Sequence, residues 1–190
     1  MISVTVQLTK NPVDSALRGW LKTGGVIAYP TESCYGLGCD PMNPHAVRRI
    51  LQLKGRPKSK GLILIAARVE QLKRYVDAEA LQAAKHSGYW PGPVTLLLPA
   101  AGHCPPWLSG RHTKLAVRVT AHPLAASLCE RLGMALVSTS ANRAGGRPLK
   151  NARDCHRMFG NQIRVIPGKI GTARRPSTII DFASGDILRS

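Results

Sequence analysis

The chain has 190 residues, 44% of them hydrophobic, and a mean hydropathy of -0.08, which predicts one soluble globular domain over residues 1–190. Its net charge of +17 favours an anionic partner such as a nucleotide or RNA, and its 10 acids make a two-carboxylate hydrolase or a carboxylate metal cage hard to assemble. No apolar run could span a bilayer and no signal peptide opens the chain, so we expect a cytoplasmic protein without a membrane partner.

The cysteines and histidines do not form a metal-binding pattern. The five cysteines are scattered without a CxxC pair, and the six histidines include no HExxH motif. We therefore expect reduced thiols and no protein-bound transition metal.

The first half of the chain predicts strands that alternate with helices. Asn11-Pro12 and Asn43-Pro44 are typical of helix starts, because asparagine caps the first turn and proline is tolerated at its first position. The predicted strands are 2–8, 26–29 and 62–66, and the predicted helices are 12–23, 44–54, 69–76 and 78–87. A polar turn with glycines is expected between the second strand and the second helix.

The second half repeats this alternation and ends in a hairpin. The predicted strands are 94–98, 115–119, 135–137, 164–166, 178–182 and 187–189, the helices begin at 123 and 152, and 100–113 is a loop. Because the last two strands are joined by the turn Ser184-Gly185-Asp186, they should pair antiparallel. We therefore expect an α/β fold with an open, twisted, mixed parallel and antiparallel sheet and flanking helices.

Four cations lie close together at the end of the helix 44–54. Lys54, Arg56, Lys58 and Lys60 are separated by a glycine and a proline, which suits a bent loop that grips an anion more than a solvated helix face. The helix dipole alone could explain Lys54, but not Arg56 or Lys60.

The chain lacks a P-loop, and Gly36-Leu37-Gly38 is followed by Asp40-Pro41 where a dinucleotide fingerprint needs its helix.

Two polar segments follow predicted strands. Thr31-Glu32-Ser33 and Ser138-Thr139-Ser140-Ala141-Asn142 could contact a ligand at a strand end, or could only stabilise a turn and cap a helix. Arg118 lies inside the strand 115–119, where a buried charge needs a partner. Because acids are few, an anionic ligand is one candidate partner, and an exposed position at a sheet edge is the alternative.

Taken together, these segments resemble the YrdC/TsaC-type threonylcarbamoyl-AMP synthases in their short, single-domain bacterial form. The similarity spans about residues 12–189 and rests on five segments in the same order: YPTESCYGLGCD, Lys54-Gly55-Arg56 with Lys60, AVRVT, STSAN and Pro176-Ser177-Thr178-Ile179-Ile180. It implies a YrdC-like fold around a basic concave cleft. It also implies a nucleotidyltransferase that forms L-threonylcarbamoyl-AMP and pyrophosphate from L-threonine, bicarbonate and ATP for t6A modification of tRNA.

The resemblance also implies roles for individual residues. The signature residues of the family correspond to Lys54, Arg56, Ser140 and Asn142. Lys54, Arg56 and Lys60 would hold phosphates or the threonine carboxylate, Arg118 and Ser140 would contact the nucleotide or carbamate, and Asn142 the phosphate region. Thr31 and Tyr35 would shape the threonine pocket, with Ser177, Thr178 and Arg189 along the nucleotide. Mg²⁺ would arrive on ATP, because no acid cluster could cage it.

An RNA-binding module without adenylate-forming activity remains the alternative. The net charge of +17 and the basic loops of residues 143–175 would suit double-stranded RNA or tRNA, but aromatic residues, at 5%, are too few for a stacking platform. The family resemblance implies a further interaction with the downstream threonylcarbamoyl-transferase proteins. It leaves open the role of residues 143–175.

Overall fold

A sheet and six helices organise residues 12–190, the part of the chain that the computed structural model describes. The strands are β1 (Ile27–Pro30), β2 (Tyr35–Gly38), β3 (Ile63–Ala66), β4 (Val94–Pro99), β5 (Lys114–Val119), β6 (Leu136–Ser140), β7 (Arg164–Val165), β8 (Thr178–Asp181) and β9 (Ile187–Arg189). The helices are α1 (Pro12–Lys22), α2 (Pro44–Lys54), α3 (Ala78–Lys85), α4 (Pro106–Ser109), α5 (Pro123–Leu132) and α6 (Ala152–Phe159), with two 3-10 turns, η1 (Val69–Leu72) and η2 (Gly160–Gln162).

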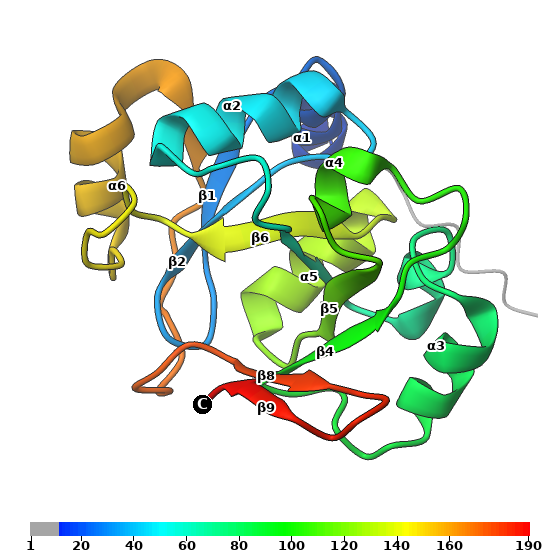
Figure 1. The fold of residues 1–190 in the computed structure, drawn as a ribbon. Coiled ribbons are helices and arrows are strands. Elements are labelled where there is room, and N and C mark those ends of the chain that lie inside the picture. Colours follow the sequence, from blue (N-terminus) through cyan, green and yellow to red (C-terminus); the bar gives the residue numbers. More distant parts are fainter. Residues whose placement is uncertain (1–11) are drawn as a thin grey trace, which may run out of the picture.

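The strands form one mixed sheet. Within residues 12–190 nine strands pair in the order β7-β1-β2-β6-β3-β5-β4-β8-β9 (Figure 1). The pairs β1–β7, β3–β5 and β4–β8 are parallel, and the neighbouring pairs between them are antiparallel. The predicted α/β fold with an open mixed sheet and a closing hairpin is therefore confirmed.

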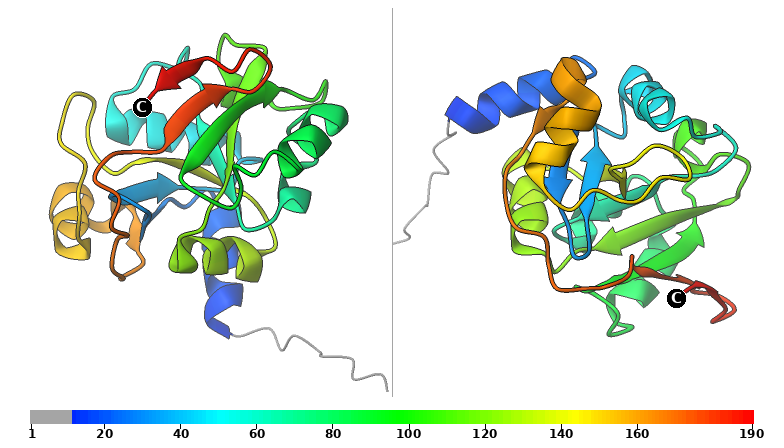
Figure 2. Two further views of the ribbon diagram at one scale, coloured as in Figure 1. Left: turned by 90° about the horizontal axis from the view of Figure 1, so that it is seen from below. Right: turned by 90° about the vertical axis from the view of Figure 1, so that its left-hand side faces the viewer.

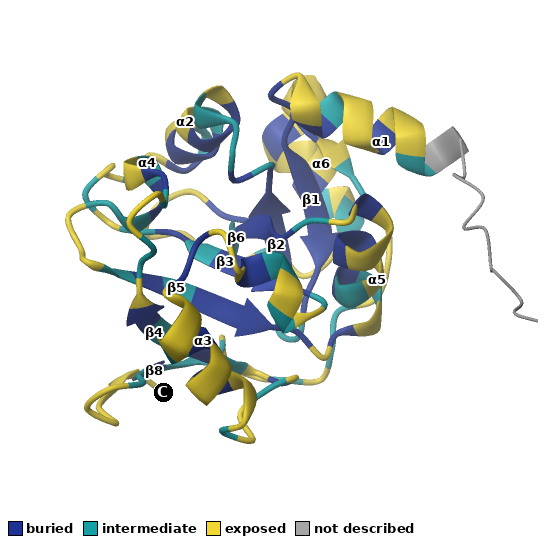
Figure 3. Cartoon of the chain, turned by 90° about the vertical axis from the view of Figure 1, so that its right-hand side faces the viewer, coloured by how far each residue is buried: buried dark blue, intermediate teal, exposed yellow. Residues whose placement is uncertain are grey.

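Helices cover both faces of the sheet, and each face has its own hydrophobic core (Figure 2). Helices α1 and α5 pack on one face, whereas α2, α3, α4 and α6 pack on the other. Because side chains alternate along a strand, Ile27 and Tyr29 face the first core while Val26 and Ala28 face the second. The strands at the centre are accordingly buried, and the outer faces of the helices are exposed (Figure 3).

The structure departs from the predicted elements in four places. Residues predicted as a turn form β2, the predicted helix 69–76 is only the 3-10 turn η1, the loop 100–113 contains α4, and Ser138–Ser140 belong to β6 instead of following a strand. In β6 the hydroxyl-bearing residues pair with β2 on one side and β3 on the other, so backbone pairing overrides their turn propensity. The predicted strand 2–8 and the cap Asn11 lie outside the described residues.

Close packing requires a glycine at position 38 of β2. A Cβ atom at Gly38 would lie 2.7 Å from Cε1 of Tyr29 and 2.8 Å from the carbonyl oxygen of Val137. We expect Gly38→Ala to lower the free energy of unfolding by about 1–3 kcal/mol, because the core would be overpacked. Gly102→Ala, where the new Cβ would meet no atom within 4 Å, is the matched control in urea denaturation. Equal midpoints for the two variants would contradict this account of β2.

The ends of α2 fix the loop that follows it. The side chain of Asn43 accepts hydrogen bonds from the backbone N–H groups of His45 and Ala46, as the Asn-Pro pattern predicts. At the other end Gly55 adopts a left-handed conformation with φ of 61°, which is easy for glycine, and its N–H caps the carbonyl of Gln52. The chain therefore turns sharply between Lys54 and Arg56, and these two side chains point in different directions.

Candidate active site

A small cavity of about 170 Å³ opens over four neighbouring strands, β2, β6, β3 and β5. The turn before β2 and the loop after α2 form two of its walls, and the segments around residues 148, 177 and 189 close it. Its lining residues are Thr31, Ser33, Cys34, Gly36, Arg56, Leu62, Ile63, Arg118, Ser138, Thr139, Ser140, Pro148, Pro176, Ser177 and Arg189. Six of the predicted site residues therefore meet here: Thr31, Arg56, Arg118, Ser140, Ser177 and Arg189.

Three guanidinium groups converge on this cavity, those of Arg56, Arg118 and Arg189. Burial lowers the pKa of Arg189, and the nearby charges of Arg118 and Arg56 lower it further. Burial also lowers the pKa of Arg56. Because arginine stays charged at neutral pH, the cavity has a strongly positive potential.

Two of these arginines have buried hydrogen-bond donors that no acceptor satisfies. The Nη2 atom of Arg56 donates to the carbonyl of Gly61 at 2.8 Å, but its Nε has no partner among the described residues. The Nε of Arg118 is likewise buried and finds no hydrogen-bond partner within residues 12–190. An unsatisfied buried donor costs roughly 1–3 kcal/mol, so both atoms favour an acceptor supplied by a ligand.

Arg118 has an acidic partner that the sequence did not reveal. Its Nη2 lies 3.1 Å from Oε2 of Glu32, and the two side chains are only 7% and 15% exposed. The alternative of an exposed edge position is wrong, because β5 lies between β3 and β4 in the sheet. The argument that only a ligand could balance the charge is also incomplete, because the turn before β2 brings Glu32 to Arg118.

The turn before β2 forms the uncharged wall. The backbone N–H of Thr31 and its Oγ1 both donate to the carbonyl of Cys34, at 2.9 and 2.7 Å, which closes the turn and presents Ser33 and Cys34 to the cavity. Burial raises the pKa of the Cys34 thiol, so it is neutral at physiological pH and a poor nucleophile. This wall offers hydroxyl and thiol groups to a small polar ligand.

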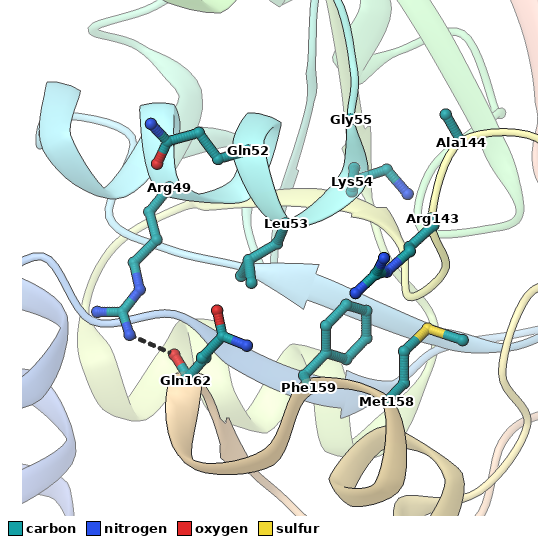
Figure 4. Close-up of a pocket in the computed structure, with 10 residues that line it drawn as sticks. All are labelled: Arg49, Gln52, Leu53, Lys54, Gly55, Arg143, Ala144, Met158, Phe159 and Gln162. Atoms are coloured by element: carbon teal, nitrogen blue, oxygen red, sulfur yellow. Dashed lines mark hydrogen bonds between the residues drawn. The ribbon is translucent and has the colours of Figure 1, made fainter.

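Lys54, in contrast, is directed into the protein. Its Nζ donates to the carbonyls of Ser140 and Asn142, at 2.5 and 2.9 Å, and to Oδ1 of Asn142 at 3.1 Å. All three ammonium protons are used, and the residue is only 4% exposed. It lines a separate pocket of about 680 Å³ between α2 and α6, which shares no residue with the cavity (Figure 4).

Asn142 completes the same network. Its Oδ1 accepts a hydrogen bond from Oγ of Ser140 at 2.6 Å, and its Nδ2 donates to the carbonyls of Arg143 and Gly146. The amide therefore fixes the loop after β6 from inside and leaves Ser140 at the cavity wall. The sequence predicted Lys54 and Asn142 at the ligand, whereas their contacts in the structure hold the loop that carries Ser140.

Three further predicted residues are not at the cavity. The Tyr35 hydroxyl donates to the carbonyl of Gly168 and accepts from its N–H, so it joins β2 to residue 168. Thr178 begins β8 and pairs with Val94. Lys60 is exposed and lines a pocket of about 690 Å³ that adjoins the cavity and shares Arg56, Leu62, Ile63 and Arg189 with it.

Sequence reasoning missed some cavity residues. Cys34, Gly36 and Pro148 line the cavity, and Glu32 pairs with Arg118, which also lines it. None of these four was among the predicted site residues. Glu32 could have been singled out as a site residue, because it is one of few acids and lies between Thr31 and Ser33, but the sequence does not name its partner. Pro148 carries no chemical signal of its own.

Two further features of the described residues concern metal ions and membranes. Residues 12–190 contain no group of three or more His, Cys, Asp or Glu residues placed to hold a metal ion. No helix in this part of the chain is long and apolar enough to cross a bilayer.

Comparison with known proteins identifies relatives over nearly the whole chain. Residues 20–190 match the Sua5/YciO/YrdC family model, described as "Telomere recombination". The threonylcarbamoyl-AMP synthase of Thiobacillus denitrificans is 57% identical over 92% of this chain and 93% of its own length, and that of Chromobacterium violaceum is 58% identical over 90% of each.

Solved structures agree with this family. The structure of E. coli YciO matches with a TM-score of 0.76 and 27% identity, over 93% of this chain and 88% of that one. The structure of P. abyssi Sua5 complexed with L-threonine matches with a TM-score of 0.82 and 34% identity over 93% of this chain. This chain spans about half the length of that Sua5 chain, because the match covers 53% of it.

Proposed function

We propose a location for each substrate, from the premise that this chain belongs to the Sua5/YciO/YrdC family and makes threonylcarbamoyl-AMP for the t6A modification of tRNA. L-threonine and the ATP phosphates meet in the cavity of about 170 Å³. The observation that carries this proposal is the convergence of Arg56, Arg118 and Arg189, two of them with a buried Nε that lacks an acceptor. Carboxylate and phosphate oxygens are the acceptors that guanidinium groups bind best.

The two walls of the cavity suit the two substrates. The turn at Thr31, Ser33 and Cys34 offers small polar groups without charge, which fits the side chain and amine of threonine. The arginine wall fits the threonine carboxylate and the phosphates. We propose Arg56 and Arg118 at this junction, with Ser140 donating its hydroxyl to a carbamate or phosphate oxygen once Asn142 releases it.

The nucleoside of ATP belongs in the adjoining pocket. At about 690 Å³ this pocket is large enough for a base and ribose, whereas the cavity is not. Leu108, Leu115 and Ile179 contribute an apolar lining, and Arg56 and Arg189 stand where the two spaces join. The α-phosphate would therefore lie between the nucleoside and threonine, with Lys60 near the outer phosphates.

The reaction needs charge neutralisation more than acid or base groups. The threonine amine takes up CO₂ derived from bicarbonate and loses a proton to become a carbamate. A carbamate oxygen then attacks the α-phosphorus, a new P–O bond forms, and the bond to pyrophosphate breaks. Because both reactants are anions, arginines that hold them together supply much of the acceleration.

Lys54 and Asn142 act on this reaction by position. Through the contacts of the Lys54 ammonium with Ser140 and Asn142, the end of α2 is fastened to the loop after β6. We propose that this network sets the place of Ser140 opposite Arg56.

Among residues 12–190, no group of three or more His, Cys, Asp or Glu residues is placed to hold a metal ion. Glu32 is engaged by Thr120 and Arg118, and Asp181 by Lys114. Since no cluster of acids lies among residues 12–190, we propose that Mg²⁺ enters bound to the phosphates of ATP.

Activity should fall as the pH rises through about 8. Burial, with a contribution from Arg56, lowers the pKa of Lys54 to about 8, so above this pH the ammonium becomes a neutral amine with only two N–H donors for its three acceptors, and its charge is lost. Because the folded-state pKa lies below the unfolded one, deprotonation relieves the cost of the buried charge, and this group makes the fold more stable, not less, as the pH rises from 8 toward 10. The loss of activity is therefore expected without unfolding.

The measurement is the rate of threonine-dependent pyrophosphate release between pH 7 and 9, for wild type and Lys54→Met. The ratio of the two rates cancels the titration of threonine and bicarbonate, which affects both proteins alike. We expect the ratio to fall above pH 8, and a constant ratio would refute a role for the Lys54 charge.

We also propose that tRNA, or another double-stranded RNA, binds the basic surface of this enzyme. Residues 143–175 contain nine lysines and arginines and one acid, which supports electrostatic binding of a phosphate backbone. RNA affinity should then decrease steeply with salt, and replacing Arg174 and Arg175 by alanine should reduce that slope. A salt-independent affinity would contradict the proposal.

The downstream threonylcarbamoyl-transferase proteins remain proposed partners.

A further inference from the structure

The ion pair behind the cavity has an unusual geometry. Although Nη2 of Arg118 lies 3.1 Å from Oε2 of Glu32, this oxygen makes no hydrogen bond with acceptable geometry among residues 12–190, and Nε of Arg118 makes none either. Charge attraction therefore holds the two groups together without using up the donors of the guanidinium. Arg118 stays available on the side that lines the cavity.

The second carboxylate oxygen of Glu32 is held firmly. Oγ1 of Thr120 donates to Oε1 of Glu32 at 2.6 Å, and the same hydroxyl accepts from the N–H of His122 at 3.2 Å. Thr120 lies two residues beyond Arg118, directly after the end of β5. The hydrogen bond from Thr120 therefore holds the Glu32 carboxylate close to Arg118.

The backbone of Glu32 is clamped as well. The segment 168–173, which we call the strap, crosses the turn before β2, and its N–H groups at Gly171 and Ala173 donate to the carbonyls of Thr31 and Glu32. A Cβ atom at Gly171 would lie 2.7 Å from the Glu32 carbonyl oxygen, so the two backbones touch. The strap itself is fastened through Gly168 to Tyr35 and through Lys169 to His122.

We propose that Glu32 is a positioning residue for the adenylate-forming step. It aims the guanidinium of Arg118 into the cavity and partly balances the three converging arginines, so that anionic substrates bind without being held too tightly to react. This inference rests on the proposed place of the reaction at Arg118. Thr120 and the strap keep the Glu32 carboxylate in place.

The test is Glu32→Gln, which keeps an oxygen for Thr120 but removes the charge and places an amide N–H₂ or a neutral oxygen before Arg118. We expect kcat for threonine-dependent pyrophosphate release to fall about 10- to 100-fold, as misplacement of a reacting group does. The KM for ATP should stay equal or decrease, because the cavity becomes more positive. If Glu32 had a merely structural role, Glu32→Gln would lower the melting temperature and the active fraction. It would not lower kcat while leaving the KM for ATP equal or smaller.

Three further variants make the outcome decisive. Thr120→Val should lower kcat in the same direction, and its effect should be less than additive with Glu32→Gln, because both act through one carboxylate. Glu130→Gln, which breaks the exposed pair with Arg68, is the control and should behave as wild type. If Arg118→Ala retains activity, the proposed place of the reaction is wrong. If Arg118→Ala is inactive but Glu32→Gln has the kcat and KM of wild type, only the role of Glu32 is overturned.

Discussion

Arg56→Ala is expected to lower kcat/KM at least about 100-fold while the protein stays folded, because it removes a cation preorganised for the transferring phosphate. The guanidinium of Arg56 lines both the cavity and the adjoining pocket, so it can contact the α-phosphate and the leaving pyrophosphate. Its one side-chain hydrogen bond to another described residue goes to Gly61, and losing this bond should cost only about 1 kcal/mol of stability. The measurement is threonine-dependent pyrophosphate release, with thermal unfolding as the check on folding.

Lys58→Ala is the matched control for this variant. Lys58 lies two residues further along the same loop, is exposed, and lines neither the cavity nor the adjoining pocket. Removing it changes the net charge by the same amount, so it reports any general electrostatic effect. Equal losses in the two variants would show that Arg56 acts only through the overall field and would remove it from the site.

Lys54→Met is the second large effect that we expect, with kcat at least about 100-fold lower and the KM for ATP changed much less. The methionine keeps the apolar length of the side chain but leaves two carbonyls and the amide oxygen of Asn142 without their common donor. Ser140 is then no longer held in place, although Arg56 and Arg118 can still bind the phosphates. Steady-state kinetics in both substrates separates these two parameters.

A double-mutant cycle with Asn142 tests whether the two residues act as one unit. Asn142→Ala should resemble Lys54→Met, and the double variant should be little worse than either single one, because both break the same network. Lys22→Met, at the exposed end of α1, is the control for loss of a lysine. Additive losses, or a KM for ATP that rises in proportion to the loss of kcat, would instead indicate that Lys54 binds a substrate directly.

Most of the fold could be predicted because its elements have local signals. The Asn-Pro start and glycine end of α2 and the strand β5 follow from patterns that the backbone itself dictates. The strand β2 could not be predicted in this way. Its glycines lower strand propensity, and Gly38 is present because the Tyr29 ring and the Val137 carbonyl leave no room for a side chain there, which is a tertiary constraint.

The site shows the same division. Arg56 and Arg118 could be identified from their charge and from their places, Arg56 in the loop after α2 and Arg118 within a strand. The partner of Arg118 could not, because Glu32 is distant in sequence and meets it only after β1 and β5 have taken their places in the sheet. The contacts of Lys54 likewise depend on the left-handed turn at Gly55. Because of this turn, the side chains of Lys54 and Arg56 point in different directions.

The most direct test of the account is a crystal structure of this protein with L-threonine and a non-hydrolysable ATP analogue. We predict threonine against the turn at Thr31 and Cys34, and phosphate oxygens within hydrogen-bond distance of Arg56 and Arg118. The nucleoside should lie in the adjoining pocket, and the ammonium of Lys54 should still contact Ser140 and Asn142. Phosphates bound away from both arginines, for example in the pocket between α2 and α6, would contradict the proposed site.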